Sequence, residues 1–250
     1  MKFIYLISIS LMLFQTADGQ IVNIEKKRST KSGFNATVKF SYNIKQTGSK
    51  LTQLNNSADI QYHKNAYRFI FLNNLSLLRY AGGDLVNDGF QHLRYNYTYK
   101  DSSILTLEVF AQHQYNENKL LKQRLLLGAG PRFRLIDKPN FSWYAAPLVM
   151  LEKETLSSDE NSETSITRLD AYSTININII EKISFNYISY FQPNLSNTED
   201  YRFSLESGLS FKLSKYFAYN LSFAMDYDSI PPEGVENKFY YFKNQLVILL

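Results

Sequence analysis

Histidine and nucleophilic side chains would be the easiest catalytic groups to recognise in this chain, and they are few. The sequence contains three histidines, His63, His92 and His113, and no cysteine. Without cysteine the chain cannot form a disulfide, a zinc–thiolate site or a thiol nucleophile. A serine hydrolase needs a serine, a histidine and an acid or amide that meet in space. The first question is therefore whether any of the three histidines has such neighbours.

His113 is the histidine best placed for lipid hydrolysis. It continues the alternating series Leu105, Leu107, Val109 and Ala111, so it should point outward near one end of an extended segment. None of the neighbours expected on the flanking segments is a serine. These neighbours are Gly89, Gln91, Gln123 and Leu125. The simpler interpretation is a histidine at the level of lipid headgroups.

A peptidase site built from acids and a histidine is the second catalytic possibility. Asp226, Asp228, Glu152 and His92 are all expected near the same end of the extended segments. A polar interior supplies such residues by default, so their presence does not favour catalysis. The acidic stretch 159–163 could bind Ca²⁺, but it lacks the spacing of a defined calcium loop. We expect no metal site and no cofactor.

Charged side chains at alternate positions form the most informative set. Eleven cations and six acids have the same inward facing. They are compatible with a network of ion pairs that fills and stiffens an interior, or with a narrow pore that mildly prefers anions. The expected lumen-lining charges are Arg94, Glu108, Arg124, Arg132, Arg134, Arg168, Asp170, Arg202, Glu206, Asp226 and Asp228. The other inward charges are Lys39, Lys45, Arg68, Lys212, Lys243 and Asp59.

Extended segments must position these charges. Apolar and polar residues alternate with a period of two, as where Val38 and Phe40 interleave with Thr37 and Lys39, and this pattern indicates strands. We find no convincing helical period. About twelve segments share the pattern: 36–45, 54–63, 67–79, 89–99, 103–115, 121–136, 141–152, 166–178, 182–192, 200–213, 216–228 and 238–250. The third and seventh are apolar on both faces, which leaves their facing open.

The connections between these segments are of two kinds. Those after the odd-numbered segments are longer and polar, such as 81–88, 152–165, 193–199 and 229–237, whereas those after the even-numbered segments are tight. Long strands with loops sorted in this way are typical of outer-membrane barrels and not of soluble sandwiches. The sequence therefore predicts an all-β fold, an antiparallel up-and-down transmembrane β-barrel of about twelve strands. Both chain termini should then be periplasmic.

The N-terminus has the features of an export signal. Met1 and Lys2 give a short positive start, residues 3–14 form an apolar run, and small residues precede a cleavage site at Gly19. That run is shorter than the ~20 residues of a membrane-spanning helix. We expect a signal peptide at 1–19, a polar N-terminal arm at 20–35 and the barrel at 36–250, located in the bacterial outer membrane.

Composition narrows the function classes. The net charge is +4 and there is no long basic block, which argues against nucleic acid as a partner. The mean hydropathy of −0.29 excludes a bundle of membrane-spanning helices. Aromatic residues make up 15% of the chain and gather near the ends of the apolar faces, as do Tyr42, Tyr95 and Tyr201. Tyrosine favours the boundary between lipid and water.

Four stretches of sequence resemble a known family. They are GFQHLRYNY at 89–97, LEVFAQHQYNENKLLKQRLLLGAGPRFRL at 107–135, YFQPNLSNTEDYRFSLESGLSFKLSK at 190–215 and YDSIPPEGVENKFYY at 227–241. They are similar to a family catalogued as a domain of unknown function, whose members are called salt-induced outer-membrane proteins, with the Bacteroidetes branch the most similar. The resemblance covers most of residues 55–242. It implies an outer-membrane barrel and a link to salt or envelope stress, but no substrate and no catalytic residues.

The sequence thus predicts a non-enzymatic outer-membrane barrel, either structural or a narrow channel for small anionic solutes. The alternative is a barrel enzyme that acts on lipid or peptide at the outer leaflet. Expected partners are outer-membrane lipids and the barrel assembly machinery, although the final residue, Leu250, is not the aromatic usual in bacterial barrels. Arg202 should bridge Asp226 or Asp228 near the outer end, while Arg132 and Arg134 should lie near the periplasmic end with fewer acids.

Overall fold

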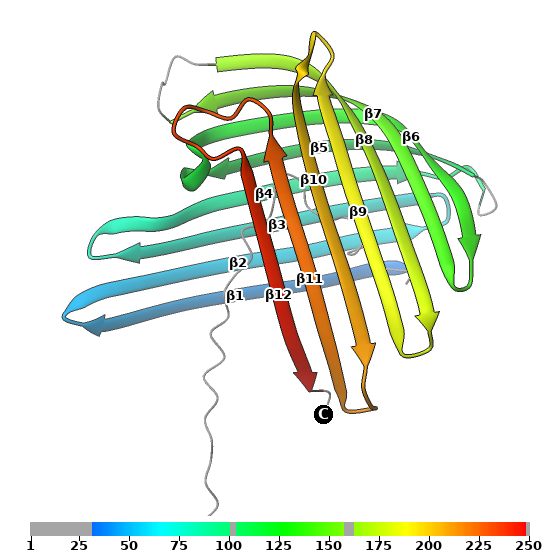
Figure 1. Cartoon of the computed structure of the whole chain (residues 1–250), viewed down its shortest axis with the longest axis horizontal. Coiled ribbons are helices and arrows are strands. Elements are labelled where there is room, and N and C mark those ends of the chain that lie inside the picture. The colour runs from blue at the N-terminus through cyan, green and yellow to red at the C-terminus, as the bar shows by residue number, and fades with distance from the viewer. Residues whose placement is uncertain (1–31, 101–103, 158–162, 249–250) are drawn as a thin grey trace, which may run out of the picture.

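Twelve antiparallel strands form one curled sheet in the computed structural model, which describes residues 32–100, 104–157 and 163–248 (Figure 1). Each strand pairs with its neighbours in sequence, so the order in the sheet follows the order in the chain. This confirms the predicted all-β fold of twelve up-and-down strands. The strands are β1 (Gly33–Thr47), β2 (Ser49–Lys64), β3 (Tyr67–Tyr80), β4 (Gly83–Tyr97), β5 (Leu105–Asn116), β6 (Leu121–Lys138), β7 (Phe141–Leu156), β8 (Glu163–Ile180), β9 (Ile183–Asn194), β10 (Asn197–Lys212), β11 (Phe217–Asp228) and β12 (Lys238–Ile248).

Besides the strands, the described residues contain little regular secondary structure. One turn of 3₁₀ helix, η1 (Glu117–Lys119), connects β5 to β6. No helix in the described part of the chain is long and apolar enough to cross a membrane. The expected signal peptide at 1–19 lies outside the described residues, and β1 begins at Gly33, inside the stretch assigned to the N-terminal arm.

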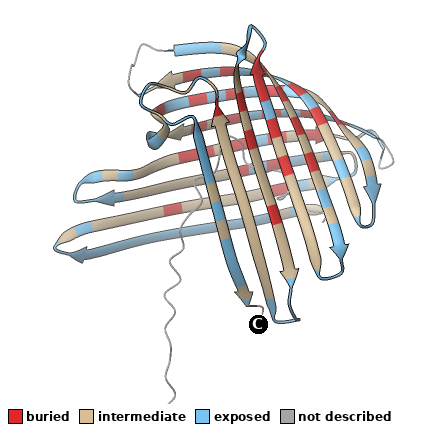
Figure 2. Cartoon of the chain, viewed as in Figure 1, coloured by how far each residue is buried: buried red, intermediate tan, exposed pale blue. Residues whose placement is uncertain are grey.

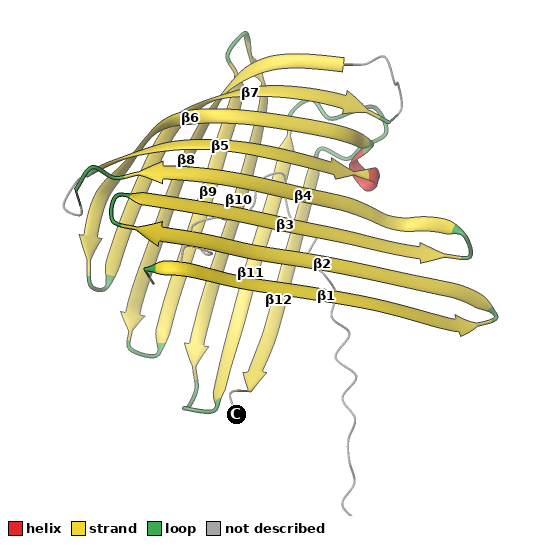
Figure 3. Ribbon diagram, turned by 180° about the vertical axis from the view of Figure 1, so that it is seen from behind, coloured by secondary structure: helices red, strands yellow, loops and turns green. Residues whose placement is uncertain are grey.

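The curl gives the sheet a convex and a concave face, because its first and last strands come round to face each other (Figures 1 and 3). Strand β7, whose facing the sequence left open, shows how the faces are occupied. Leu148 and Met150 are buried on the concave side, whereas Val149 and Leu151 are exposed on the convex side. The alternation along the strand therefore separates two environments, as the period of two requires.

The strands continue further than the sequence pattern suggested. Gly48 alone connects β1 to β2, and only residues 81–82 connect β3 to β4, so most of the expected loop at 81–88 is strand. Gly48 and Gly82 have φ values of +85° and +91°, which glycine adopts without strain. The expected contrast between long and short connections is thus only partly found. Hairpin pairing uses backbone groups, so it continues where the side chains turn polar.

Strands β1 and β12 are the two edges of the sheet. No pairing between them is found among the described residues, and both are largely exposed, whereas the buried residues gather on the strands between them (Figure 2). Side chains therefore pack unevenly over the concave face. It is packed in the middle strands and accessible along its margins.

Candidate functional site: the concave face of the sheet

Arg202 is the centre of a buried ionic network near the end of the sheet where β11 and β12 are connected. Its guanidinium contacts Asp228 through Nε at 2.8 Å, Glu152 through Nη1 at 2.5 Å and Glu154 through Nη2 at 3.1 Å. Arg124 also binds Glu154, at 2.6 Å. The expected contact between Arg202 and Asp228 is present, and two further carboxylates share the same arginine. One cation thereby joins β7, β10 and β11.

Arg168 extends this network to β8 and β9. Its Nε lies 3.3 Å from Glu152, and its Nη2 lies 2.9 Å from Asp200. Nη1 donates to the carbonyl oxygen of Gln192 at 3.1 Å. We call the group formed by Arg124, Glu152, Glu154, Arg168, Asp200, Arg202 and Asp228 the outer network. Because each charge has an opposite partner nearby, burial does not leave any of them uncompensated.

A second cluster surrounds Glu108, whose side chain is 0% exposed. Arg94 Nη1 lies 3.0 Å from Glu108 Oε2, and Tyr172 Oη donates to the same oxygen at 2.6 Å. Asn96 donates to the other oxygen, Oε1, and Arg132 Nε lies 3.9 Å from it. This central cluster therefore supplies two cations and two further donors to one carboxylate.

Apolar side chains fill the space around these charges. Phe110 lies against Gly128, where a Cβ atom would come within 2.3 Å of the phenyl ring, so only glycine fits at this position. One charged residue lies among these apolar side chains: Asp170 is buried and accepts a hydrogen bond from Gln192 at 2.8 Å. The buried apolar group consists of Phe110, Leu126, Ala146, Leu148, Met150, Tyr172, Ile188 and Tyr190. Across β4–β10 the concave face is thus a packed core of mixed polarity.

Three further charges expected on the concave face are Arg132, Arg134 and Glu206. Arg132 is buried and its guanidinium lies 3.8 Å from the centre of the Tyr144 ring, beside Glu108. Arg134 pairs with Asp137 at 3.0 Å. Each of these two arginines therefore has a carboxylate nearby, but Arg132 shares Glu108 with Arg94, so the expectation of fewer acids at their level stays a prediction. Glu206 is half-buried on β10.

The candidate peptidase residues do not meet. His92 contacts Gln112 at 2.9 Å and Arg94 at 3.3 Å, while Glu152 and Asp228 are both bound to Arg202. In the described ranges no group of three acidic or histidine side chains is arranged to hold a metal ion. Most of the acidic stretch 159–163 lies outside those ranges, and Glu163 pairs with Lys153 at 2.9 Å.

His113 belongs to a row of polar side chains on the convex face. Its Nδ1 lies 2.6 Å from Gln91 Oε1, and Gln91 donates to Asn73 at 3.1 Å. Asn73 in turn donates to Asn56 at 2.6 Å. This polar ladder crosses β2, β3, β4 and β5, with mainly apolar side chains beside it on the same face. The neighbours predicted for His113 on the two flanking strands, Gln91 and Leu125, are the residues opposite it.

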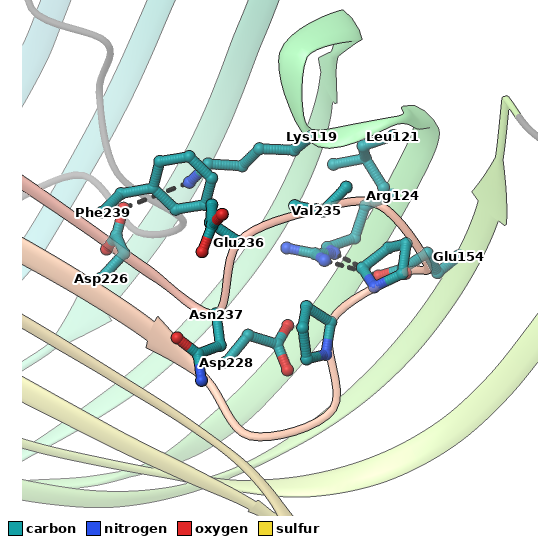
Figure 4. Close-up of a pocket in the computed structure, with 12 residues that line it drawn as sticks. Lys119, Leu121, Arg124, Glu154, Asp226, Asp228, Val235, Glu236, Asn237 and Phe239 are labelled. Carbon is teal, nitrogen blue, oxygen red and sulfur yellow. Dashed lines mark hydrogen bonds and ion pairs between the residues drawn. The ribbon is translucent and has the colours of Figure 1, made fainter.

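A pocket opens beside the outer network, where the loop 229–237 folds over the concave face (Figure 4). Lys119 of η1 reaches across to Asp226 at 3.2 Å, and its Nζ lies 5.0 Å from the centre of the Phe239 ring. Asp226 therefore binds Lys119, whereas Asp228 binds Arg202. The contact ties the connection between β5 and β6 to β11 and β12.

Three members of these clusters, Glu154, Asp200 and Lys119, were missed by sequence reasoning. Glu152 and Glu154 are spaced as neighbours on one face of a strand, and this spacing would have placed them together had the facing of β7 been settled. Asp200 lies where the pairing of β9 with β10 is irregular, which breaks the alternation. No pattern in the sequence indicates that Lys119 crosses to β11.

Comparison with known proteins gives the family. A family model described as "Protein of unknown function, DUF481" matches residues 23–248. The chain belongs to this family. Two porins are similar to the DUF481 chain: the NanC porin, with a TM-score of 0.48 and 9% identity over 85% of this chain and 99% of that chain, and the KdgM porin, with a TM-score of 0.40 and 12% identity over 84% and 98%. No curated protein matches the DUF481 chain.

Proposed function

We propose that this DUF481 protein is a non-enzymatic β-barrel of the bacterial outer membrane that acts as a narrow channel for small solutes. One observation carries the proposal, which is the distribution of polarity between the two faces. Leu127 and Leu151 are 55% and 56% exposed on the convex face, while Arg94 and Arg168 are both 2% exposed on the concave face. A protein surrounded by water would expose its arginines and bury its leucines. A barrel surrounded by lipid, with a polar interior, has the arrangement found here.

Closure of the sheet belongs to the same proposal. In lipid an unpaired strand edge leaves backbone groups without partners, at a cost of several kcal/mol for each group. Pairing of β1 with β12 would satisfy both edges and complete a barrel of an even number of strands. Export by residues 1–19, insertion by the barrel assembly machinery and a surrounding of outer-membrane lipids follow from this proposal. The link to salt or envelope stress, and the Bacteroidetes branch, rest on the sequence resemblance.

Cell fractionation tests the location. Separated inner and outer membranes from cells that express the full chain should contain the protein in the outer-membrane fraction, where alkaline carbonate does not extract it. Recovery in the soluble periplasmic fraction would contradict the proposal.

Conductance tests the channel. The purified protein in a planar bilayer should produce small discrete current steps in potassium chloride, because a narrow path admits few ions. Folded protein that inserts without any current would leave a structural barrel, an outcome that the packed middle of the concave face would explain.

A further inference from the structure

The concave face is not equally filled. On β3 and β7 the inward side chains Ile70 and Leu148 are both 0% exposed. On β1 the inward residues Lys39, Ser41 and Lys45 are all exposed. Figure 2 shows the same division, with buried positions on the middle strands and exposed or intermediate ones along β1 and β12. A passage for water and solutes therefore cannot run through the middle of the face, where side chains occupy the space.

The concave side of β1, β2, β11 and β12, which we call the marginal face, is polar. Pairs of strands place these residues opposite one another, as Lys39 opposite Ser57 and Lys243 opposite Ser222. Asn55 donates to Ser41 at 3.4 Å, so polar groups on β2 and β1 also contact each other. Hydroxyl and amide side chains of this kind stabilise water along a path through a membrane.

Three lysines give the marginal face its charge. Lys39 and Lys45 on β1 and Lys243 on β12 form no ion pair with any other residue that the structure describes. Of the acids on the same face, Asp226 is in an ion pair with Lys119 at 3.2 Å, and Asp59, which accepts a bond from the neutral amide of Gln61 at 2.8 Å, keeps its charge, so the three lysines outnumber it. The net field along this face is therefore positive, in contrast to the paired charges of the outer network and the central cluster.

We propose that the solute path runs along the marginal face and that Lys39, Lys45 and Lys243 give it a preference for small anions. The inference rests on the proposed channel function and locates its path. Pairing of β1 with β12 in lipid brings lysines of both strands onto one wall of the lumen. A charge held on a low-dielectric wall acts strongly on ions in a narrow passage, because little water screens it. Carboxylates, phosphate and chloride are solutes of suitable charge.

Ion selectivity tests this assignment. In a potassium chloride gradient the wild-type channel should have a reversal potential on the anion side, and the double variant Lys39→Glu with Lys243→Glu should move it to the cation side. The matched control is Lys138→Glu with Lys153→Glu, which makes the same change of charge at the β6–β7 turn and on the convex face. The control should keep the wild-type reversal potential. An unchanged reversal potential in the lysine pair of the marginal face would overturn the proposed path.

A second measurement does not depend on charge reversal being tolerated. The chain contains no cysteine, so a single introduced thiol is unique. A bulky charged thiol reagent should remove most of the current of Ser41→Cys channels and leave that of Thr174→Cys channels unchanged, because Thr174 is buried in the packed part of the face. No block at Ser41→Cys would also overturn the path while the channel itself stands. Absence of current in the wild-type protein would instead overturn the channel, and the path with it.

Discussion

Arg202 shows what a single buried cation does in this protein. It holds three carboxylates from two other strands, with its own side chain and that of Glu152 almost fully buried. Removal of the arginine leaves acids with one partner fewer in a site from which water is largely excluded. The cost of such a change arises from the charges left behind and not from the lost contacts alone.

We therefore expect Arg202→Ala to lower the free energy of unfolding by about 3–5 kcal/mol, as for other broken buried ion pairs. Arg134→Ala is the matched control, since its ion pair with Asp137 is partly exposed and should contribute about 0–1 kcal/mol. Unfolding by urea in detergent micelles measures both. Equal losses in the two variants would show that the outer network does not stabilise the fold.

Part of the outer network could be predicted from the sequence. Parity along β10 and β11 placed Arg202 and Asp228 on one face and at one height, and these two residues are paired in the sheet. It did not reach Glu154, because β7 has apolar residues on both faces over most of its length. Parity also cannot predict which partner a charge selects when several are within reach. Arg132 contacts Glu108 because the two side chains lie diagonally opposite each other on the paired strands β5 and β6.

At the scale of the strand, the alternation itself has a measurable consequence. Leu127 lies on the convex face of β6 and Ser222 on the concave face of β11, on the accessible margin. Leu127→Arg should cost about 2–4 kcal/mol of unfolding free energy if the residue lies at the bilayer midplane. Ser222→Arg should cost much less, since the new charge meets water.

The choice of control matters for this comparison. Ser204 has the same facing as Ser222, yet it is 6% exposed, so an arginine there would have to displace packed neighbours. Unfolding in detergent should give Ser204→Arg a larger loss than Ser222→Arg. A similar cost for Leu127→Arg and Ser222→Arg would mean that the convex face does not contact lipid.

Strand number and order were predictable because each strand carries its own period-two pattern. Strand ends were not, since polar residues pair as well as apolar ones when the partner strand continues, as at Gly83 in β4. The uneven packing of the concave face could not be predicted from the sequence either. It depends on how far the sheet curls and on the volumes of side chains such as Phe110 and Met150. The alternation of apolar and polar residues carries no information about either.

For the whole molecule, the proposed barrel would have both described ends of the sheet on one side of the membrane, because the strand number is even. Asn197, at the start of β10, and Lys138, at the end of β6, then lie on opposite sides. We expect an epitope tag inserted before Asn197 to bind antibody on intact cells, and one inserted after Lys138 to bind only after the outer membrane is permeabilised. Labelling of intact cells at Lys138 would reverse the orientation. The polar connection 152–165 should be on the same side as Asn197, but Ser158 within it lies outside the described residues.

The polar ladder of Asn56, Asn73, Gln91 and His113 bears on how the strands find one another. A strand that slides by two residues keeps its apolar side toward lipid, so alternation alone does not detect the error. If the convex face contacts lipid as proposed, such a slide would separate the amides of the ladder and leave them in hydrocarbon without partners, which is costly. Three bonds across four strands thus distinguish the native alignment of β2–β5 from its near copies. In the proposed barrel, disruption of this row should therefore yield mispaired barrels that insert slowly, and not merely less stable ones.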